Sequence, residues 1–183
     1  MKYKIIQDED VESPREWDNL GKMVLSHRRY SLPNEIGLEI QRQFDNWEEV
    51  RLHLEEEKGA TVILPIFMMD HSGLTLRVGS DEFRAYDPQG WDWGQVGFAF
   101  ATREAILENW SRKKLTQKLR LEAEAVLRSE VRVYSQYLSG ECFGFVITDD
   151  DGEAVDSCWG YFGYGEAEEA AKEAMATLQK DAA

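Results

Sequence analysis

The sequence predicts an α+β protein with a mostly antiparallel sheet, built from hairpins, and with helices packed on one face. Two observations support this prediction: the expected order of elements is β-α-β-β-β-α-α-β-β-α, and hairpins join the strand pairs 60–69/74–78 and 143–148/154–159. A chain of 183 residues fits one domain, and no internal repeat or linker-like break divides it. We therefore expect a single α+β domain over residues 1–183.

Each element is predicted from a local signal. Apolar residues three and four apart mark amphipathic helices, and runs rich in β-branched residues mark strands. Ser13 and Thr102 are expected to cap helical turns, and Pro65 is expected at a sheet edge or a bulge because it cannot donate to a strand ladder. The expected strands are residues 4–6, 60–69, 74–78, 96–101, 143–148 and 154–159. The expected helices are residues 36–54, 102–110, 115–137 and 166–179, with a short helical turn at residues 13–21.

The net charge of −14 is distributed unevenly along the chain. Residues 1–60 have a net charge of −5, residues 61–140 are neutral, and residues 141–183 have 11 acidic and 2 basic side chains. An acidic field repels phosphate backbones, which disfavours direct nucleic-acid binding over most of the surface. The same field attracts a basic partner, including a protein surface that binds DNA. Simple solubility is the alternative explanation of the charge.

Composition also indicates a cytoplasmic protein. No apolar run approaches the ~20 residues that span a membrane, and residues 1–6 lack the apolar stretch of a signal peptide. The chain has two cysteines, Cys142 and Cys158, which we expect to be reduced thiols.

No familiar catalytic or metal-binding motif is present. Residues 70–72 place Asp, His and Ser side by side in a turn, whereas the members of a catalytic triad converge from separate elements. Cys142 and Cys158 lack companion ligands at zinc-site spacing. The acidic turn at residues 149–153 does not match an EF-hand, since Ile147 and Cys158 would fill the first and last ligand positions. We assign no catalytic residue, metal or cofactor.

Two aromatic, glycine-containing segments are candidates for a recognition surface. Residues 91–97 and 159–164 place large rings among glycines, and Trp and Tyr are frequent interface anchors. Core packing is the alternative interpretation. With the carboxylates of the acidic turn, the expected binding residues are Trp91, Trp93, Asp149, Asp150, Asp151, Glu153, Trp159, Tyr161 and Tyr164.

Five segments resemble a family of short uncharacterised proteins of bacteriophages, plasmids and other mobile elements. These segments are residues 13–21, 27–30, 64–73, 91–97 and 156–160, and the resemblance spans residues 13–165. This chain has Trp93 where the family pattern has a small, Ser-like residue. The resemblance implies a mobile element in a bacterial host and carries no particular activity.

The leading hypothesis is a non-enzymatic acidic binding protein in the host bacterial cytoplasm that inhibits restriction or CRISPR machinery. Its carboxylates would occupy a basic, nucleic-acid-binding surface of a host protein. The alternative is a small enzyme acting on a nucleotide or nucleic acid, with a site assembled from separate segments. Its candidate residues are Asp18, His27, Arg28, Arg29, Asp70, His71, Asp92 and Gln95. A structural role in a phage particle is a third hypothesis.

Overall fold

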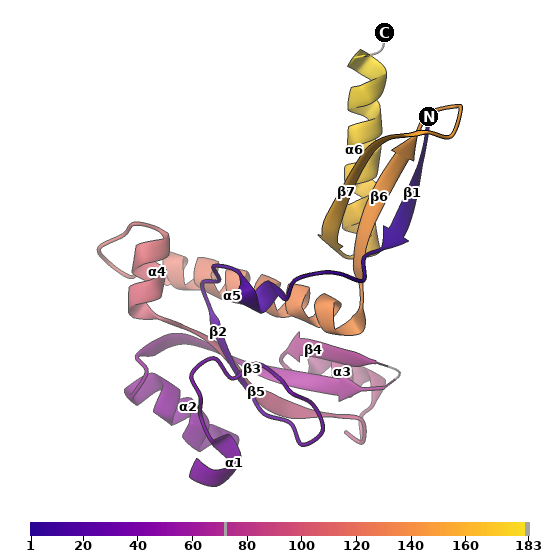
Figure 1. Cartoon of the computed structure of the whole chain (residues 1–183). Helices are drawn as coiled ribbons and strands as arrows, with labels where there is room; N and C mark the ends of the chain where they lie inside the picture. The colour runs from indigo at the N-terminus through magenta and orange to yellow at the C-terminus, as the bar shows by residue number, and fades with distance from the viewer. Residues whose placement is uncertain (72, 182–183) are drawn as a thin grey trace. The chain divides into compact units, whose positions relative to one another are not determined.

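The computed structural model describes residues 1–71 and 73–181, and the chain divides into two compact units. Unit 1 comprises Met1–Ser13 and Gln136–Ala183, and unit 2 comprises Pro14–Ser135. The chain starts in unit 1, forms all of unit 2 and returns to unit 1 near the end of helix α5 (Figure 1). The single domain over residues 1–183 stays a prediction, and the structure adds this organisation into two units.

Each unit combines helices with an antiparallel sheet, which confirms the α+β class. The strands form two sheets instead of the one expected, with the orders β1-β6-β7 and β2-β5-β3-β4. The strands are β1 (Lys2–Gln7), β2 (Lys22–Leu25), β3 (Ala60–Asp70), β4 (Leu74–Val78), β5 (Trp93–Thr102), β6 (Cys142–Thr148) and β7 (Ala154–Phe162). The helices are α1 (Ile40–Gln43), α2 (Trp47–Glu56), α3 (Asp81–Tyr86), α4 (Arg103–Asn109), α5 (Gln117–Ser139) and α6 (Tyr164–Asp181).

Unit 1 is a three-stranded sheet with α6 on one face. Strand β6 lies in the centre, and its Phe145 and Ile147 form a buried core with Ala171 of α6. Tyr3 and Ile5 of β1 pack against the same core. The expected arrangement, with the helix on one face of an antiparallel sheet, describes this unit.

Unit 2 has a four-stranded sheet with helices on both faces. Val24, Phe98 and Phe100 form a core with Val50 and Leu54 of α2. Figure 1 shows α5 on the opposite side of this sheet from α2. Every residue of β5 from position 96 to position 101 is buried, as expected for a strand covered on both faces.

The helix expected over residues 36–54 is broken into α1 and α2. Phe44 follows α1 in an extended conformation, and Asn46 begins α2 by accepting a hydrogen bond from the Glu49 N–H at 3.1 Å. The Glu49 carboxylate in turn accepts from the N–H of Asp45, the residue before the N-cap, at 2.9 Å, which is a variant of the capping box. The capping signal therefore overrides the continuous apolar periodicity.

Pro65 lies in an interior strand of the sheet. It lies at a position where the missing proline N–H removes no hydrogen bond to β4. Strand β3 pairs with β5 along most of its length, whereas its pairing with β4 begins at Ile66. The register of β3 against β5 shifts between Ile66 and Phe67, next to the proline. Strand β2 and helix α3 were not expected from the sequence.

Within the described residues, no helix is long and apolar enough to cross a membrane.

Candidate functional site

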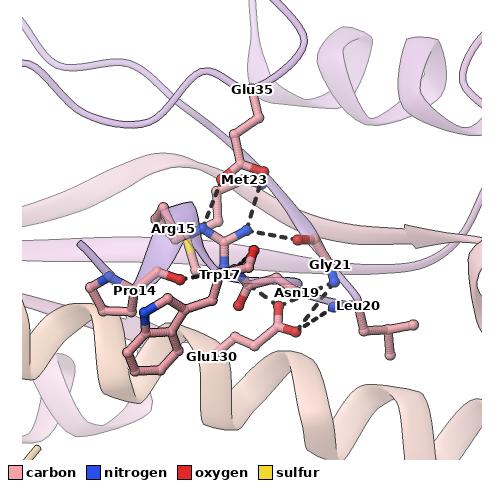
Figure 2. Close-up of polar contacts among 9 residues, drawn as sticks. All are labelled: Pro14, Arg15, Trp17, Asn19, Leu20, Gly21, Met23, Glu35 and Glu130. Atoms are coloured by element: carbon pink, nitrogen blue, oxygen red, sulfur yellow. Dashed lines mark hydrogen bonds and ion pairs between the residues drawn. The ribbon is translucent and has the colours of Figure 1, made fainter. Parts of the chain in front are cut away.

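The segment at residues 14–21 is built around the buried guanidinium group of Arg15 (Figure 2). Arg15 Nε donates to Glu35 Oε1 at 2.7 Å, and Nη2 donates to the Gly21 carbonyl at 2.7 Å. Arg15 Nη1 lies 3.5 Å from Glu130 Oε2 in α5. The Arg15 and Glu130 side chains are 7% and 12% exposed, so a buried cation lies between two carboxylates.

Glu130 also binds the backbone of this segment. The N–H groups of Leu20 and Gly21 donate to its carboxylate at 2.8 and 3.2 Å. Burial raises the pKa of Glu130 above its ordinary value, although Arg15 and the two N–H donors act in the opposite direction. A Cβ on Gly21 would lie 2.1 Å from Leu127 Cδ2 of α5. Arg15 and Gly21 are therefore structural residues that hold this segment against α5.

A polar pocket of about 320 Å³ in unit 2 brings together three segments that are distant in the sequence. The first segment follows β2, the second is the end of β3, and the third leads into β5. The polar lining residues are His27, Arg29, Asp70, Asp92 and Gln95, while Trp91 and Trp93 add aromatic rings. The residues proposed for an active site thus do converge, in part.

Asp70 is the most densely contacted carboxylate of this pocket. Arg29 Nη2 donates to Asp70 Oδ2 at 2.6 Å, and the Tyr30 hydroxyl donates to the same oxygen at 2.8 Å. The Tyr30–Asp70 hydrogen bond raises the pKa of Tyr30 above its ordinary value. The His27 ring stacks on Tyr30 with centroids 5.0 Å apart. Tyr30, which the sequence analysis did not single out, therefore joins the first segment to the second.

His71 and Asp92 form a second pair at the pocket. His71 Nδ1 lies 3.2 Å from Asp92 Oδ2, and the Asp70 N–H donates to the Asp92 carbonyl at 2.9 Å. A carboxylate beside one ring nitrogen orients an imidazole and leaves the other nitrogen for a substrate. This pair is the arrangement in the pocket best suited to moving a proton.

Asp87 organises the loop that carries the two tryptophans. Its carboxylate accepts from the N–H groups of Gln89, Gly90, Trp91 and Asp92, and these bonds lower the pKa of Asp87. Trp93 Nε1 donates to the Asp87 carbonyl at 2.8 Å.

The two tryptophans of this loop differ in exposure. The Trp91 side chain is 82% exposed. Trp93 is half-buried, and its ring lies 5.8 Å from that of Phe67. Trp91 is therefore available for contact with a ligand or partner, whereas Trp93 packs partly into the protein.

The packing of β2 on β5 depends on a glycine beside the pocket. Gly97 has a φ of +152°, and a Cβ there would lie 2.0 Å from the Val24 carbonyl oxygen. Residue 97 must therefore be glycine for these two strands to pair, which places the segment after β2 beside the start of β5.

Three of the eight candidate active-site residues do not line the pocket. Arg28 lines a separate hollow with Ile40, Phe44 and Trp47, and Asp18 lies in another with Glu108. His71 contacts the pocket through Asp92. The other five candidates are lining residues.

The acidic turn of unit 1 is the tip of the β6–β7 hairpin, as expected. Asp149 is used internally, because its carboxylate accepts from the N–H groups of Asp151 and Glu153 at 3.0 and 2.9 Å. Asp150 is exposed and lies 2.7 Å from the amino group of Met1. Asp151 and Glu153 are exposed as well.

The aromatic residues proposed for binding in unit 1 separate into exposed and packed side chains. Trp159 is 47% exposed, and its ring lies against Gly144, where a Cβ would be 2.3 Å from the indole. Tyr164 is exposed, whereas Tyr161 packs against the core under α6. A hydrogen bond with Cys158 raises the pKa of Tyr161 to about 12. Trp159 and Tyr164 are therefore the accessible aromatic groups.

The two units differ strongly in charge. Unit 1 has 15 acidic and 4 basic side chains, whereas unit 2, the larger unit, has 20 acidic and 17 basic side chains. The net charge is therefore −11 for unit 1 and −3 for unit 2. The expected binding residues divide accordingly, with Trp91 and Trp93 in unit 2 and the others in unit 1.

In the part of the chain that the structure describes, no three His, Cys, Asp or Glu side chains are grouped to hold a metal ion. Cys142 is buried and Cys158 is exposed, and both are free thiols. They do not face each other, since Cys142 pairs with Phe162 and Cys158 with Phe145.

No protein-family model, curated protein or solved structure matches the chain.

Proposed function

We propose that the chain is a non-enzymatic acidic binding protein of a mobile genetic element, acting in the bacterial cytoplasm on a basic host protein. The observation that supports this proposal is the net charge of −11 carried by unit 1. The partner is a nucleic-acid-handling component of host defence, of the restriction or CRISPR type. The mobile-element setting comes from the sequence resemblance, and the partner's basic character comes from the charge.

The proposed mechanism is occupation of a surface that otherwise binds DNA. Carboxylates such as Asp151 and Glu153 displace the counterions of a basic channel, as phosphates do. The exposed Trp159 supplies an apolar contact that excludes water at the interface. Binding of this kind weakens steeply with salt, because exposed charges are screened.

A pull-down of the full chain from host lysate tests this function. It is run at about 0.1 M and about 1 M salt, between which the Debye length falls from about 10 Å to about 3 Å. We expect a nucleic-acid-handling protein at low salt that is released at high salt and that DNA displaces. Absence of any such protein at low salt contradicts the proposal.

A matched pair of variants separates the charge of unit 1 from total charge. Asp151→Asn with Glu153→Gln removes two exposed charges from unit 1, and Glu56→Gln with Glu57→Gln removes two from unit 2. We expect the first pair to weaken binding about fivefold, at about 0.5 kcal/mol per exposed charge. The second pair leaves binding unchanged. Equal effects of the two pairs contradict a binding surface in unit 1.

A second function is proposed for unit 2, as a small enzyme acting on a nucleotide or nucleic acid. The convergence of His27, Arg29, Asp70, Asp92 and Gln95 on one pocket supports it. In this function the His71–Asp92 pair accepts a proton from the substrate. Arg29 exchanges its ion pair with Asp70 for a contact with a phosphate oxygen of the substrate. Trp91 stacks on the base.

Two neighbouring arginines provide the test of this second function. Arg29 lines the pocket, whereas Arg28 lies in a different hollow. Titration with a panel of mononucleotides is followed by Trp fluorescence. We expect Arg29→Ala to weaken binding of the preferred nucleotide about tenfold, as for loss of a charged hydrogen bond, and Arg28→Ala to have no effect. Absence of binding by the unmodified chain contradicts this function.

A further inference from the structure

The sheet of unit 1 has an open edge at β7. This strand ends the order β1-β6-β7, and its residues 154–160 are all exposed. Two of them are large apolar side chains, Val155 and Trp159, at 45% and 47% exposure. An edge strand of this length with exposed apolar residues is a ready template for pairing with another strand.

The backbone of β7 offers at least one donor toward this edge. The Ser157 N–H donates at 2.8 Å to the side chain of the preceding residue, Asp156. Alternate N–H groups of an antiparallel edge strand point away from the neighbouring strand, and a side-chain acceptor on the Ser157 N–H is consistent with such an outward position. The Asp156 carboxylate covers this N–H in place of a partner strand.

The two edges of this sheet are protected differently. Strand β1, at the other edge, carries Lys2 and Lys4, and lysine on an edge strand opposes strand addition. Strand β7 contains no Lys, Arg or Pro, and its one charged side chain is that of Asp156. The chemistry of the β7 edge is therefore acidic and apolar.

Charge selects the kind of strand that fits this edge. Asp150, Asp151 and Glu153 lie at the tip of the hairpin that leads into β7, and Asp156 lies within the strand. A second copy of the chain would bring another unit with a net charge of −11 against this edge, which like-charge repulsion opposes. A strand with alternating Lys or Arg instead places opposite charges beside these carboxylates.

We propose that β7 binds an extended Lys- or Arg-containing segment of a partner protein as a fourth strand of the unit 1 sheet. This inference rests on the proposed function in one respect, namely that the partner is basic. It adds a main-chain ladder to the charge attraction, so that affinity comes from backbone hydrogen bonds and selectivity from alternate side chains. Trp159 packs against an apolar side chain of the incoming strand.

Two fluorescent peptides of equal charge test strand addition against charge alone. One is an eight-residue Lys-Thr repeat, which favours an extended strand. The other is a Lys-Pro repeat, which lacks alternate N–H groups and cannot form the ladder. Anisotropy titrations with the full chain at low salt are expected to show at least about tenfold tighter binding of the Lys-Thr peptide, for the loss of two or more backbone hydrogen bonds.

Ser157 provides the matched variants. Ser157→Pro removes the outward N–H at an edge position where proline is tolerated, and Ser157→Ala retains it. We expect Ser157→Pro to weaken binding of the Lys-Thr peptide about threefold to tenfold and to leave binding of the Lys-Pro peptide unchanged. Ser157→Ala binds both peptides as the unmodified chain does. Circular dichroism and hydrogen exchange of the β6 amides verify that both variants are folded.

The possible results are distinguishable. Equal binding of both peptides, with no effect of Ser157→Pro, overturns strand addition and leaves the charge-based function standing. Absence of binding by either peptide contradicts both proposals. Sedimentation measurements also show whether the chain forms a dimer. If it does, and if Ser157→Pro converts this dimer to a monomer, the β7 edge binds a second copy of the chain and the basic-partner inference is overturned.

Discussion

The two units of this protein use charge in opposite ways. In unit 2, key charges are paired and partly buried, as in the Arg15–Glu130 and Arg29–Asp70 contacts. In unit 1, acidic side chains outnumber basic ones by 11, and the tip carboxylates of the hairpin are exposed. Charged side chains therefore stabilise the fold of unit 2, whereas in unit 1 they create a negative field that attracts basic groups.

The two units also differ in how far their sheets are buried. The unit 2 sheet is covered on both faces, and its strand β5 is buried across positions 96–101. In unit 1, helix α6 packs on the sheet, and β7 is exposed across positions 154–160. Unit 2 thus has the features of a stable scaffold with a pocket, and unit 1 has the features of a docking element.

The largest effect is expected from Arg15→Ala. This change leaves the largely buried Glu130 and the partly exposed Glu35 without their shared cation, which costs about 3–5 kcal/mol of unfolding free energy. Arg42→Ala is the control, since Arg42 and its partner Glu39 are 79% and 58% exposed. We expect the control to cost no more than about 0.5 kcal/mol. Urea denaturation measures both.

Tryptophan fluorescence assigns this loss to a unit. Trp159 is the one tryptophan in unit 1, and the other five are in unit 2. In a Trp159→Phe background, fluorescence therefore follows unit 2 alone. If Arg15→Ala leaves the midpoint of the fluorescence transition unchanged, the loss of stability does not arise in unit 2.

A smaller effect is expected at two glycines, one in each unit. Gly97→Ala places a methyl group 2.0 Å from a backbone oxygen and at a positive φ, so we expect a loss of about 3 kcal/mol. Gly144→Ala meets the half-exposed ring of Trp159 at 2.3 Å and the Cys158 carbonyl oxygen at 2.8 Å, so the ring must swing outward and the backbone must shift by less than at Gly97. We expect about 1–2 kcal/mol there, with a shift in Trp159 emission. Equal losses at both sites would contradict the tighter packing of unit 2.

Local signals predicted the elements that depend on neighbouring residues. The β6–β7 hairpin, the long helix α5 and the Thr102 cap of α4 are confirmed. The break between α1 and α2 was also readable, since Asn46 and Glu49 form a capping pair that the apolar periodicity concealed. These features require no knowledge of the rest of the chain.

Features that depend on distant pairing were not predictable in the same way. Strand β2 is short and exists because it pairs with β5, which follows only after α2, β3, β4 and α3. The pocket required Asp70 and Asp92 to meet across β3 and β5. Glu130 lies far from Arg15 along the chain, and its sequence context is that of an ordinary helical glutamate.

The pH dependence of unit 2 is expected to report on Glu130. Burial raises its pKa above the ordinary value of 4.5, so its contribution to stability is greatest at low pH and is lost as the pH rises through the raised pKa. The difference in unfolding free energy between the unmodified chain and Glu130→Gln should therefore fall as the pH increases above 4.5. A difference that grows with pH would show that the ion pair with Arg15 outweighs burial.

The smallest effect is expected from Asp87→Ala. Loss of the carboxylate that holds four backbone N–H groups loosens residues 87–93 without affecting the sheet core. Faster hydrogen exchange at the Trp91 and Asp92 amides measures this change, with Asp81→Ala as an exposed acidic control in α3. Unchanged exchange at both amides would contradict the role of Asp87.

The order of the chain through its two units has a consequence for biosynthesis. Strand β1 is synthesised before unit 2, but its partner β6 follows only after all of unit 2 has been made. Unit 2 is contiguous and can fold while β1 still lacks a partner. The acidic unit therefore assembles after unit 2, and its exposed β7 edge forms only when translation has passed β7.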